Sequence, residues 1–387
     1  MILLDAPYTS DFLIDTIRQN KYRVILNNYA NNHYKNDIQS FISGEKAIEH
    51  LSDGDDYLYT NSENAIEWIV KNLGHTPYPD QVNMFKDKYR FRELVSKMYP
   101  NVYFKKVSWN ELSKIDKETL PYPLVLKPTV GFFSLGVHIV RSKTEWNEAL
   151  QSLKKDVKRI KSMYPEQVLD VSDFIIESYI EGEEYAIDCY FNAQGNPVIL
   201  TVMKHIFSSD SDVSDRLYMT SVDIIADLKD RVDTFLQELK KLTGLTNFPL
   251  HIEVRIQDGQ IVPIEVNPLR FGGWCTTADL TWHAYGFNPY IYFFEQKQPD
   301  WNTILQREDR SLYSIIILDI PATHRSKPIK TFGYEKLLLQ FEDPVELRKI
   351  DFKRHPIFGF LFSRTSPENM NELEAILKDD LTEFIIE

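Results

Sequence analysis

The most informative segment of the chain is HIEVRIQDGQIVPIEVNP, residues 251–268. The Asp-Gly pair at 258–259 predicts a tight turn between two short strands. Glu253 lies in the first strand and Glu265 in the second, and Asn267 shares a face with Glu265 because side chains alternate along a strand. Two carboxylates and an amide oxygen suit Mg²⁺, which takes its remaining ligands from water and substrate phosphates. The segment therefore predicts a magnesium site and nucleotide chemistry.

A solvated rim of surface charge is the alternative interpretation of these glutamates. Glu265 argues against it, because apolar residues 262–264 precede it and Val266 follows it. Glutamate is seldom buried in such a strand unless it is paired or coordinates a cation. A functional site is therefore the favoured interpretation.

Composition indicates an ordinary globular protein. The 387 residues suffice for two or three domains, and 43% of them are hydrophobic. The net charge of −13 argues against general nucleic-acid binding, although it allows a local cationic pocket. No apolar run approaches membrane-spanning length, and the start MILLDAPYTSDFLID predicts a first strand rather than a signal peptide. Two cysteines, Cys189 and Cys275, are too few for a disulfide framework, so we expect buried thiols in a cytoplasmic protein without membrane or nucleic-acid partners.

The chain alternates between helical and strand patterns. Residues 1–80 alternate strand and helix, with Ser10 or Asp11 capping the first helix, and this order predicts a parallel sheet. No G-x-G-x-x-G fingerprint follows the first strand, so dinucleotide binding is not expected there. Beyond the boundary at 76–80, the sequence predicts a helix at 81–98, strands and turns at 102–143, a helix at 144–163, paired strands at 174–206, a loop at 208–221, a helix at 227–242 and a mixed C-terminal segment from 289.

A strand that ends in a lysine and runs into a glycine-rich loop appears in PLVLKPTVGFFSLGV. Lys127 ends the strand, and Gly131, Ser134 and Gly136 lie in the loop. Glycine lets backbone amides approach phosphates, and a lysine adds positive charge. A hairpin with a surface lysine is an equally acceptable interpretation of this segment alone.

Two further charged segments are most simply explained as solvated faces. FKDKYRFREL carries Lys86, Lys88 and Arg90, and ESYIEGEEY is rich in glutamate. In the second segment an apolar strand runs directly into Glu177, which makes the strand end a candidate for binding a purine and a ribose.

Taken in order, these segments resemble the ATP-grasp superfamily of ATP-dependent ligases, over roughly residues 80–285. The resemblance implies an α/β and α+β fold with three parts. These are a Rossmann-like N-terminal domain at 1–80, an ATP-grasp domain at 81–288 with the nucleotide between subdomains at about 100–175 and 176–288, and a small closing domain at 289–387.

The resemblance also implies roles for individual residues. ATP would be held by phosphate lysines, a covering loop, an adenine hinge and a ribose carboxylate, namely Lys88, Lys127, Gly131, Ser134, Gly136, Glu177, Ser178, Ile180, Glu184 and, more weakly, Lys204. Mg²⁺, or Mn²⁺ in its place, would be held by Glu253, Glu265 and Asn267.

Two departures from the family pattern concern the substrate site and the loop. Many relatives have N-P-R, whose arginine holds the substrate carboxylate, whereas this chain has Asn267-Pro268-Leu269-Arg270. Arg270 remains the candidate, with Arg255 as its rival. The loop carries Phe132 and Phe133 where small or polar residues are common.

The implied reaction is the activation of a carboxylate as an acyl phosphate, followed by amide formation with an amine. The substrates would be small molecules of amino-acid or peptide type, Lys127 would assist phosphoryl transfer, and His205 or Asp215 is a candidate base. A homodimer is a possible assembly. A bicarbonate-activating carboxylase and a non-catalytic ATP-binding regulator are the alternatives.

Overall fold

The computed structural model describes residues 1–130, 136–163, 172–209, 214–325 and 327–387. Its N-terminal part is a four-stranded parallel sheet in the order β3-β2-β1-β4, the order of the first half of a doubly wound sheet. The strands are β1 (Ile2–Leu3), β2 (Val24–Ile25), β3 (Phe41–Ile42) and β4 (Tyr59–Thr60), and the helices are α1 (Asp11–Asn20), α2 (Asn28–Tyr34), α3 (Gly44–Asp53) and α4 (Ala65–Asn72). Ser10 caps α1, because its side chain accepts a hydrogen bond from the Leu13 amide.

The segment after this sheet forms two helices, so the prediction of one helix over 81–98 was wrong. Helix α5 (Tyr78–Lys86) ends at Asp87, which adopts an extended conformation and begins α6 (Lys88–Val95). The Asp87 carboxylate accepts hydrogen bonds from the Tyr89 and Arg90 amides. This is N-cap geometry, and it turns the chain between Lys86 and Lys88.

A second four-stranded sheet is antiparallel and has the order β5-β8-β6-β7. Its strands are β5 (Phe104–Ser108), β6 (Leu124–Pro128), β7 (His138–Val140) and β8 (Asp173–Ser178), with helices α7 (Trp109–Leu112) and α8 (Glu145–Met163). The buried residues Leu124, Leu126, Trp146 and Leu153 form a core of its own between this sheet and α8.

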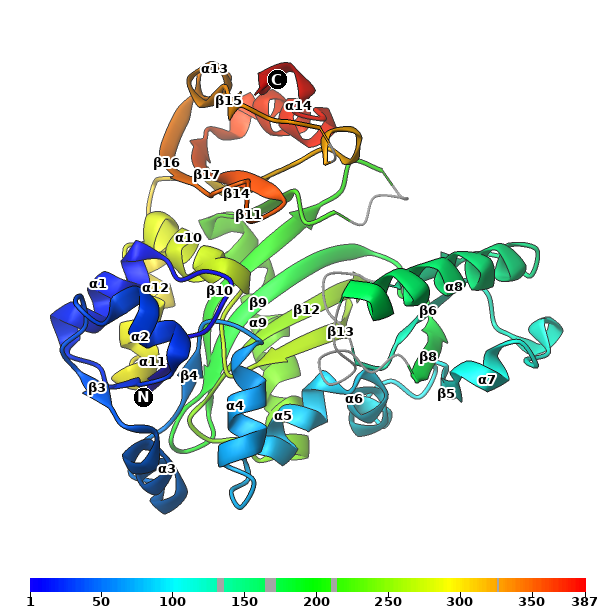
Figure 1. Cartoon of the computed structure of the whole chain (residues 1–387), viewed down its shortest axis with the longest axis horizontal. Coiled ribbons are helices and arrows are strands. Elements are labelled where there is room, and N and C mark those ends of the chain that lie inside the picture. The colour runs from blue at the N-terminus through cyan, green and yellow to red at the C-terminus, as the bar shows by residue number, and fades with distance from the viewer. Residues whose placement is uncertain (131–135, 164–171, 210–213, 326) are drawn as a thin grey trace.

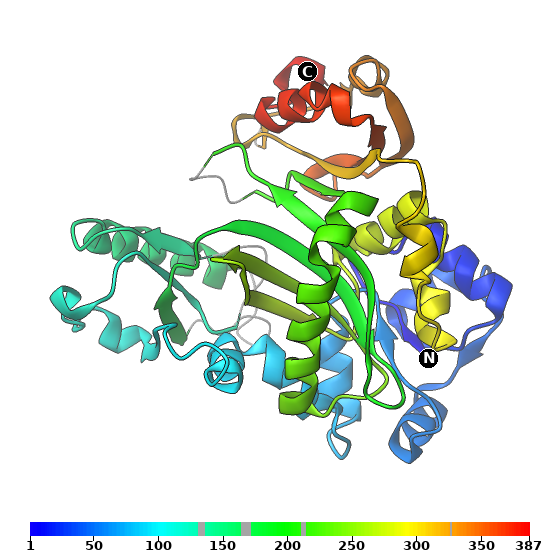
Figure 2. The same cartoon turned by 180° about the vertical axis from the view of Figure 1, so that it is seen from behind.

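The largest sheet has eight strands in the order β13-β12-β9-β10-β11-β14-β17-β16. Its strands are β9 (Glu183–Phe191), β10 (Pro197–Ile206), β11 (Leu217–Thr220), β12 (Phe248–Gln257), β13 (Gln260–Pro268), β14 (Leu312–Asp319), β16 (Asp343–Lys349) and β17 (Ile357–Thr365). Helix α9 (Val222–Thr243) lies across the back of the sheet (Figure 2) and buries Ile225, Leu228, Val232 and Leu236 at helical spacing. Each such side chain contributes about 1.5–3 kcal/mol of stabilisation.

Strand β11 corrects the prediction of a loop over the whole of 208–221. Residues 217–220 pair with β10 on one side and with β14 on the other. The polar sequence concealed this strand, because one of its two ladder partners, β14, lies far along the chain. The strand also joins the C-terminal strands to the same sheet, so no break in the sheet accompanies the expected boundary at 288.

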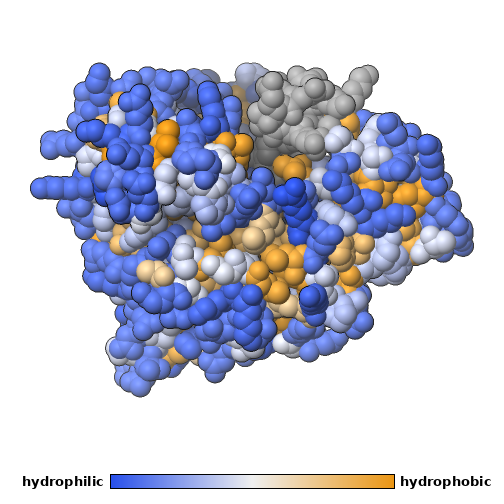
Figure 3. All heavy atoms as spheres, turned by 90° about the horizontal axis from the view of Figure 1, so that it is seen from below, coloured by the Kyte–Doolittle hydropathy of each residue, from blue (hydrophilic) through white to orange (hydrophobic). Residues whose placement is uncertain are grey.

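The remaining elements pack around the sheets (Figure 1). They are α10 (Thr276–Tyr285), α11 (Pro289–Phe294), α12 (Trp301–Ile304), α13 (Tyr334–Leu338), α14 (Asn371–Lys378), β15 (Thr331–Phe332) and β18 (Ile385–Ile386). Helix α11 returns to the N-terminal part, where the Tyr57 hydroxyl donates to the Phe294 carbonyl. Seen from below, the surface is mostly hydrophilic, with apolar residues gathered near the middle of the face (Figure 3). None of the described helices is both long and apolar enough to span a membrane.

Candidate active site

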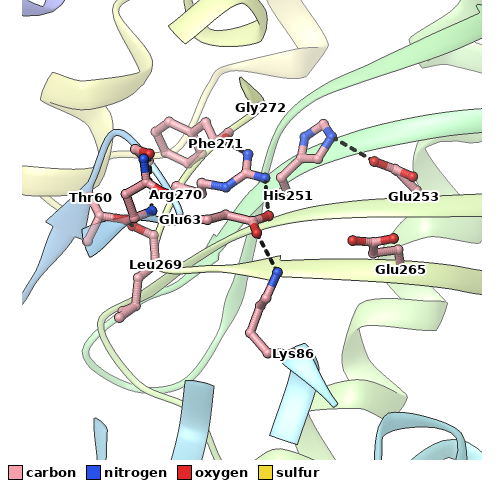
Figure 4. Close-up of polar contacts among 12 residues, drawn as sticks. Thr60, Glu63, Lys86, His251, Glu253, Glu265, Leu269, Arg270, Phe271 and Gly272 are labelled. Carbon is pink, nitrogen blue, oxygen red and sulfur yellow. Dashed lines mark hydrogen bonds and ion pairs between the residues drawn. The ribbon is translucent and has the colours of Figure 1, made fainter. Parts of the chain in front are cut away.

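The predicted hairpin forms and brings two carboxylates together. In the ladder between β12 and β13, Glu253 lies directly opposite Glu265. Asp258 and Gly259 both have positive φ, 50° and 78°, as the tight turn requires. The two carboxylates lie close to each other (Figure 4).

A β-bulge accompanies this pair. Glu265 pairs with Glu253 while Pro263 pairs with Val254, so Ile264 is the extra residue on β13. Both Ile264 and Glu265 consequently line the same cavity, although neighbours on a regular strand face opposite sides.

The cavity has a volume of about 500 Å³ and lies between the small antiparallel sheet and the large sheet. It is lined by predicted site residues from both sheets and from α6, namely Lys88, Lys127, Glu177, Ser178, Ile180, Glu184, Lys204, Arg255, Glu253 and Glu265. Segments separated by well over a hundred positions thus meet around one space.

The electrostatics of the two glutamates favour a bound cation. Burial and the adjacent Glu265 charge raise the pKa of Glu253 well above its usual range. Burial acts to raise the pKa of Glu265, but the positive charges of Lys88, at 3.4 Å, and of Lys86 and Lys127 together lower it. A divalent cation between the carboxylates would relieve their repulsion.

Asn267 supplies the third predicted oxygen. Its side chain is 3% exposed, and its Oδ1 has no hydrogen-bond partner among the described residues. An unpaired buried acceptor is costly unless a ligand uses it. No group of three or more His, Cys, Asp or Glu side chains in the described part of the chain could hold a metal, so the predicted site depends on this amide. The donor set of two carboxylates and one amide oxygen fits Mg²⁺.

The two predicted phosphate lysines both line the cavity. Lys88 is the first residue of α6, and its backbone amide donates to the Thr129 carbonyl at 2.8 Å, just beyond β6. Lys127, on β6, is 5% exposed and forms an ion pair of 2.6 Å with Glu177.

Glu177 is engaged on both oxygens rather than directed outward as a free acceptor. Arg92 pairs with its second oxygen at 2.5 Å. Burial acts to raise the pKa of Glu177, but the charges and hydrogen bonds of Arg92 and Lys127 outweigh this effect and lower the pKa to about 2. The carboxylate therefore fixes Lys127, and only the backbone of this strand end remains for reading a base.

Gly182, two residues after the hinge predicted at Glu177 through Ile180, has φ of 107°. A Cβ at Gly182 would lie 2.0 Å from the Ile256 carbonyl oxygen, so only glycine allows this approach to β12.

Arg255, the predicted rival for the substrate carboxylate, belongs to this hinge. Its Nη1 donates to the Ile180 carbonyl at 2.7 Å, its Nε donates to Glu184 at 2.9 Å, and its guanidinium lies 4.8 Å from the Tyr179 ring centre. These contacts leave Arg270 as the better candidate for the carboxylate.

Glu184 and His205 form a connected pair. The Glu184 carboxylate contacts His205 Nδ1 at 2.9 Å. Burial acts to raise the pKa of Glu184, but His205 and Arg255 together outweigh this effect and lower it. His205 Nε2 lies 3.1 Å from the Ser214 carbonyl, so both ring nitrogens have partners. Burial raises the pKa of Asp215, which accepts from the Tyr218 hydroxyl. Lys204 pairs with Glu183 at the same edge.

The glycine loop is described only at its end. Gly131, Ser134, Phe132 and Phe133 lie outside the described residues. Gly136 has φ of 76°, and a Cβ there would meet the Pro128 side chain at 3.3 Å.

Arg270 lies beside the metal strand in contact with the N-terminal part of the chain. Its Nη2 donates to Glu63 at 2.8 Å and its Nη1 to the Phe271 carbonyl at 2.8 Å. The residue inserted before it, Leu269, has φ of 62°. The Leu269 carbonyl accepts from the Thr60 amide at 2.7 Å, which ties the end of β13 to the end of β4.

Sequence reasoning missed several residues of this region. Arg92 is four positions after Lys88, one helical turn away, and this spacing was the available signal. Glu63 carried no local signal, because its partners Lys86 and Arg270 lie 23 and 207 positions away. His251 is buried between Asp188, at 2.7 Å, and Glu253, at 3.7 Å (Figure 4).

Comparison with known families agrees with this geometry. Residues 120–278 match the family model of the ATP-grasp domain. The chain therefore contains a segment that matches an ATP-grasp domain. The matched residues contain Lys127, the hinge and the β12–β13 hairpin.

Two relatives align with about half of this chain. D-alanine–D-alanine ligase of Fervidobacterium nodosum is 25% identical over 207 residues, 51% of this chain and 60% of the ligase. The carbamoyl phosphate synthase large chain of Xanthomonas campestris is 25% identical over 198 residues, 49% of this chain but 17% of the synthase. The chain thus spans less than two thirds of either relative.

A solved structure resembles this chain over its whole length. The L-amino acid ligase of Bacillus licheniformis superposes with a TM-score of 0.68, at 17% sequence identity, over 100% of this chain and 97% of the ligase. At this identity the likeness establishes the fold.

Proposed function

We propose that the protein is an ADP-forming carboxylate–amine ligase that uses ATP and Mg²⁺. One observation carries the proposal. Lys88, Lys127, Glu253 and Glu265 line a single cavity, next to an asparagine amide oxygen that has no partner in the described structure. This is the arrangement needed to hold a metal-bound triphosphate with its terminal phosphate exposed to a second substrate.

The chain's own residues would divide the binding of ATP among them. The backbone at Ser178 and Ile180 would contact the base, and Lys127, fixed by Glu177, would hold phosphate oxygens. Glu253, Glu265 and Asn267 would hold Mg²⁺, which when bound neutralises charge on the β- and γ-phosphates. Lys88 beside Glu265 would place positive charge at the same phosphates.

Arg270 would bind the carboxylate substrate. A carboxylate oxygen would attack the γ-phosphorus and break its bond to the bridging oxygen, releasing ADP and leaving an acyl phosphate. An amine would then attack the acyl carbon, forming the C–N bond, expelling phosphate and losing a proton. Orientation by fixed cations is the main contribution we assign to the chain, because the reaction needs no side-chain nucleophile.

Small amino acids or peptides are the proposed substrates, in keeping with the D-alanine–D-alanine and L-amino acid ligases to which the chain is similar. Two other classes of function remain as alternatives: a bicarbonate-activating enzyme and a non-catalytic ATP-binding regulator.

The test is ADP release from Mg-ATP across a panel of the standard amino acids, each offered as acid and as amine. We expect ADP release that requires an acid, with an amide as product by mass spectrometry. Release that depends on bicarbonate alone would favour the carboxylase class. ATP binding without turnover under every condition would favour the regulator and contradict the ligase.

A further inference from the structure

Glu63 forms ion pairs with two cations from different parts of the chain. Its Oε1 accepts from Arg270 at 2.8 Å and its Oε2 from Lys86 at 2.5 Å. The carboxylate lies between these two side chains (Figure 4), close enough to Glu265 for its charge to raise the pKa of that group.

The backbone explains why Arg270 meets Glu63. Leu269 is buried in a left-handed conformation, which costs about 1–2 kcal/mol for a residue with a Cβ. Its carbonyl is held by the Thr60 amide, three positions before Glu63. The inserted residue therefore sets Arg270 against the loop that follows β4.

The cluster keeps one net positive charge, because Lys86 and Arg270 outnumber Glu63. Two cations this close would repel each other without the carboxylate between them. Burial acts to raise the pKa of Glu63, but Lys86 and Arg270 outweigh this effect and lower the pKa to about 2. The Glu63 carboxylate is therefore charged at neutral pH.

Arg270 also retains an unused donor. The residue is 8% exposed, and its Nε has no hydrogen-bond partner within the described structure. An ammonium has three donors, of which the Glu63 pair uses one on Lys86. The cluster therefore keeps unused hydrogen-bond donors and one net positive charge, near the predicted metal ligands Glu253 and Glu265.

We propose that Glu63 is a positioning residue that holds Arg270 and Lys86 together as a two-cation subsite for the carboxylate of the acid substrate. The inference rests on the proposed ligase function and adds to it. The N-terminal part of the chain supplies the residue that orients the acid, and Lys86 is the second cation of the acid site.

The experiment measures apparent KM values for the acid and for ATP in wild type and in Glu63→Gln. The acid is the panel amino acid that gives the fastest ADP release in wild type. We expect the KM for the acid to rise by about tenfold or more and the KM for ATP to change less than about twofold. Glu63→Asp, which keeps the charge, should lie nearer to wild type than Glu63→Gln does.

Lys86→Gln tests the same subsite while leaving the Arg270–Glu63 pair in place. It should also raise the KM for the acid, and it keeps the inference testable if Glu63→Gln does not fold. The matched control is Glu346→Gln, because the Glu346 carboxylate bridges Arg348 and His283 in the C-terminal part. The control should leave the KM for the acid unchanged.

The outcomes separate the two proposals. An active wild type whose KM for the acid is unchanged in both Glu63→Gln and Lys86→Gln overturns the subsite alone. Equal effects on the acid and on ATP, or an equal effect of Glu346→Gln, show a merely structural role and also overturn it. A wild type that releases no ADP with any amino acid overturns the ligase function and the subsite together.

Discussion

Single residues around the cavity differ in how their buried charge is compensated. Lys127 and Arg92 share Glu177, whereas Glu253 faces another carboxylate across the hairpin. A paired buried charge contributes to the folded structure, and two facing carboxylates are stable together only when a proton or cation joins them. Charge compensation therefore separates Glu177, which fixes two cations in the cavity wall, from Glu253 and Glu265, whose charges a bound cation would compensate.

Glu265→Gln tests the ligand group. The variant keeps the shape of the side chain but removes one of two facing charges, so we expect a folded protein whose ADP release falls by about a hundredfold or more. Circular dichroism provides the control for folding. ADP release at the wild-type rate would remove Glu265 from the metal site.

Glu177→Gln tests the organising group through the pH dependence of stability. The pKa of Glu177 is about 2 in the folded chain, against an ordinary value of 4.5, so the carboxylate stabilises the fold above about pH 4.5. Because the folded pKa is depressed, this stabilisation, about 3 kcal/mol, is lost as pH falls from 4.5 towards 2. Urea unfolding should show a wild-type advantage over Glu177→Gln at pH 7 that shrinks steadily through this window. A pH-independent difference would contradict it.

Turns and helix ends decide how the elements present these residues. Asp87 divides α5 from α6 and thereby sends Lys86 to Glu63 and Lys88 to Glu265. Gly182 lets the turn between β8 and β9 touch β12, which brings the hinge over the cavity. In both cases one residue's conformational preference sets the direction of a whole element.

Gly182→Ala tests the close approach of hinge and sheet. The added Cβ would meet the Ile256 carbonyl at 2.0 Å, so we expect a loss of about 3 kcal/mol or more in the free energy of unfolding. Gly259→Ala is the matched control, because Gly259 has φ of 78° with nothing within 4 Å of its Cβ position. The control should cost about 1 kcal/mol. Equal losses for both variants would show that the collision is absent.

The whole molecule places the candidate site between its sheets. The small antiparallel sheet carries Lys127, the large sheet carries Glu253 and Glu265, and the N-terminal part reaches Arg270 through Glu63. A ligand in the cavity would contact both sheets at once. Its binding energy would then add to the stability of the assembled chain.

Mg-ATP should accordingly raise the thermal unfolding midpoint. At a ligand concentration of about a hundred times Kd the stabilisation is about 2.7 kcal/mol, which corresponds to a shift of a few degrees in a chain of this length. Lys127→Ala should show a smaller shift at the same concentration, and Mg²⁺ alone should show little. Identical shifts in the variant and wild type would place the nucleotide elsewhere.

Local sequence predicted the β12–β13 hairpin, because a turn dipeptide and alternating side chains act over a few residues and fix which oxygens share a face. It also predicted the first helix, with Ser10 or Asp11 as its cap, and the structure has Ser10 there. The order of segments was enough to indicate the ATP-grasp domain. It failed at 81–98 and 217–220, where a cap inside a polar run and a ladder with distant strands outweighed the local pattern.

The amino-acid sequence by itself determined which functional groups the chain contains and which of them are neighbours on one strand. Only the tertiary structure decided that Glu177 holds Lys127, that Arg255 belongs to the hinge, and that Glu63 holds Arg270. The physical reason is range. Strand alternation and turn geometry act between adjacent residues, whereas ion pairs between groups up to 207 positions apart exist only after the sheets have packed.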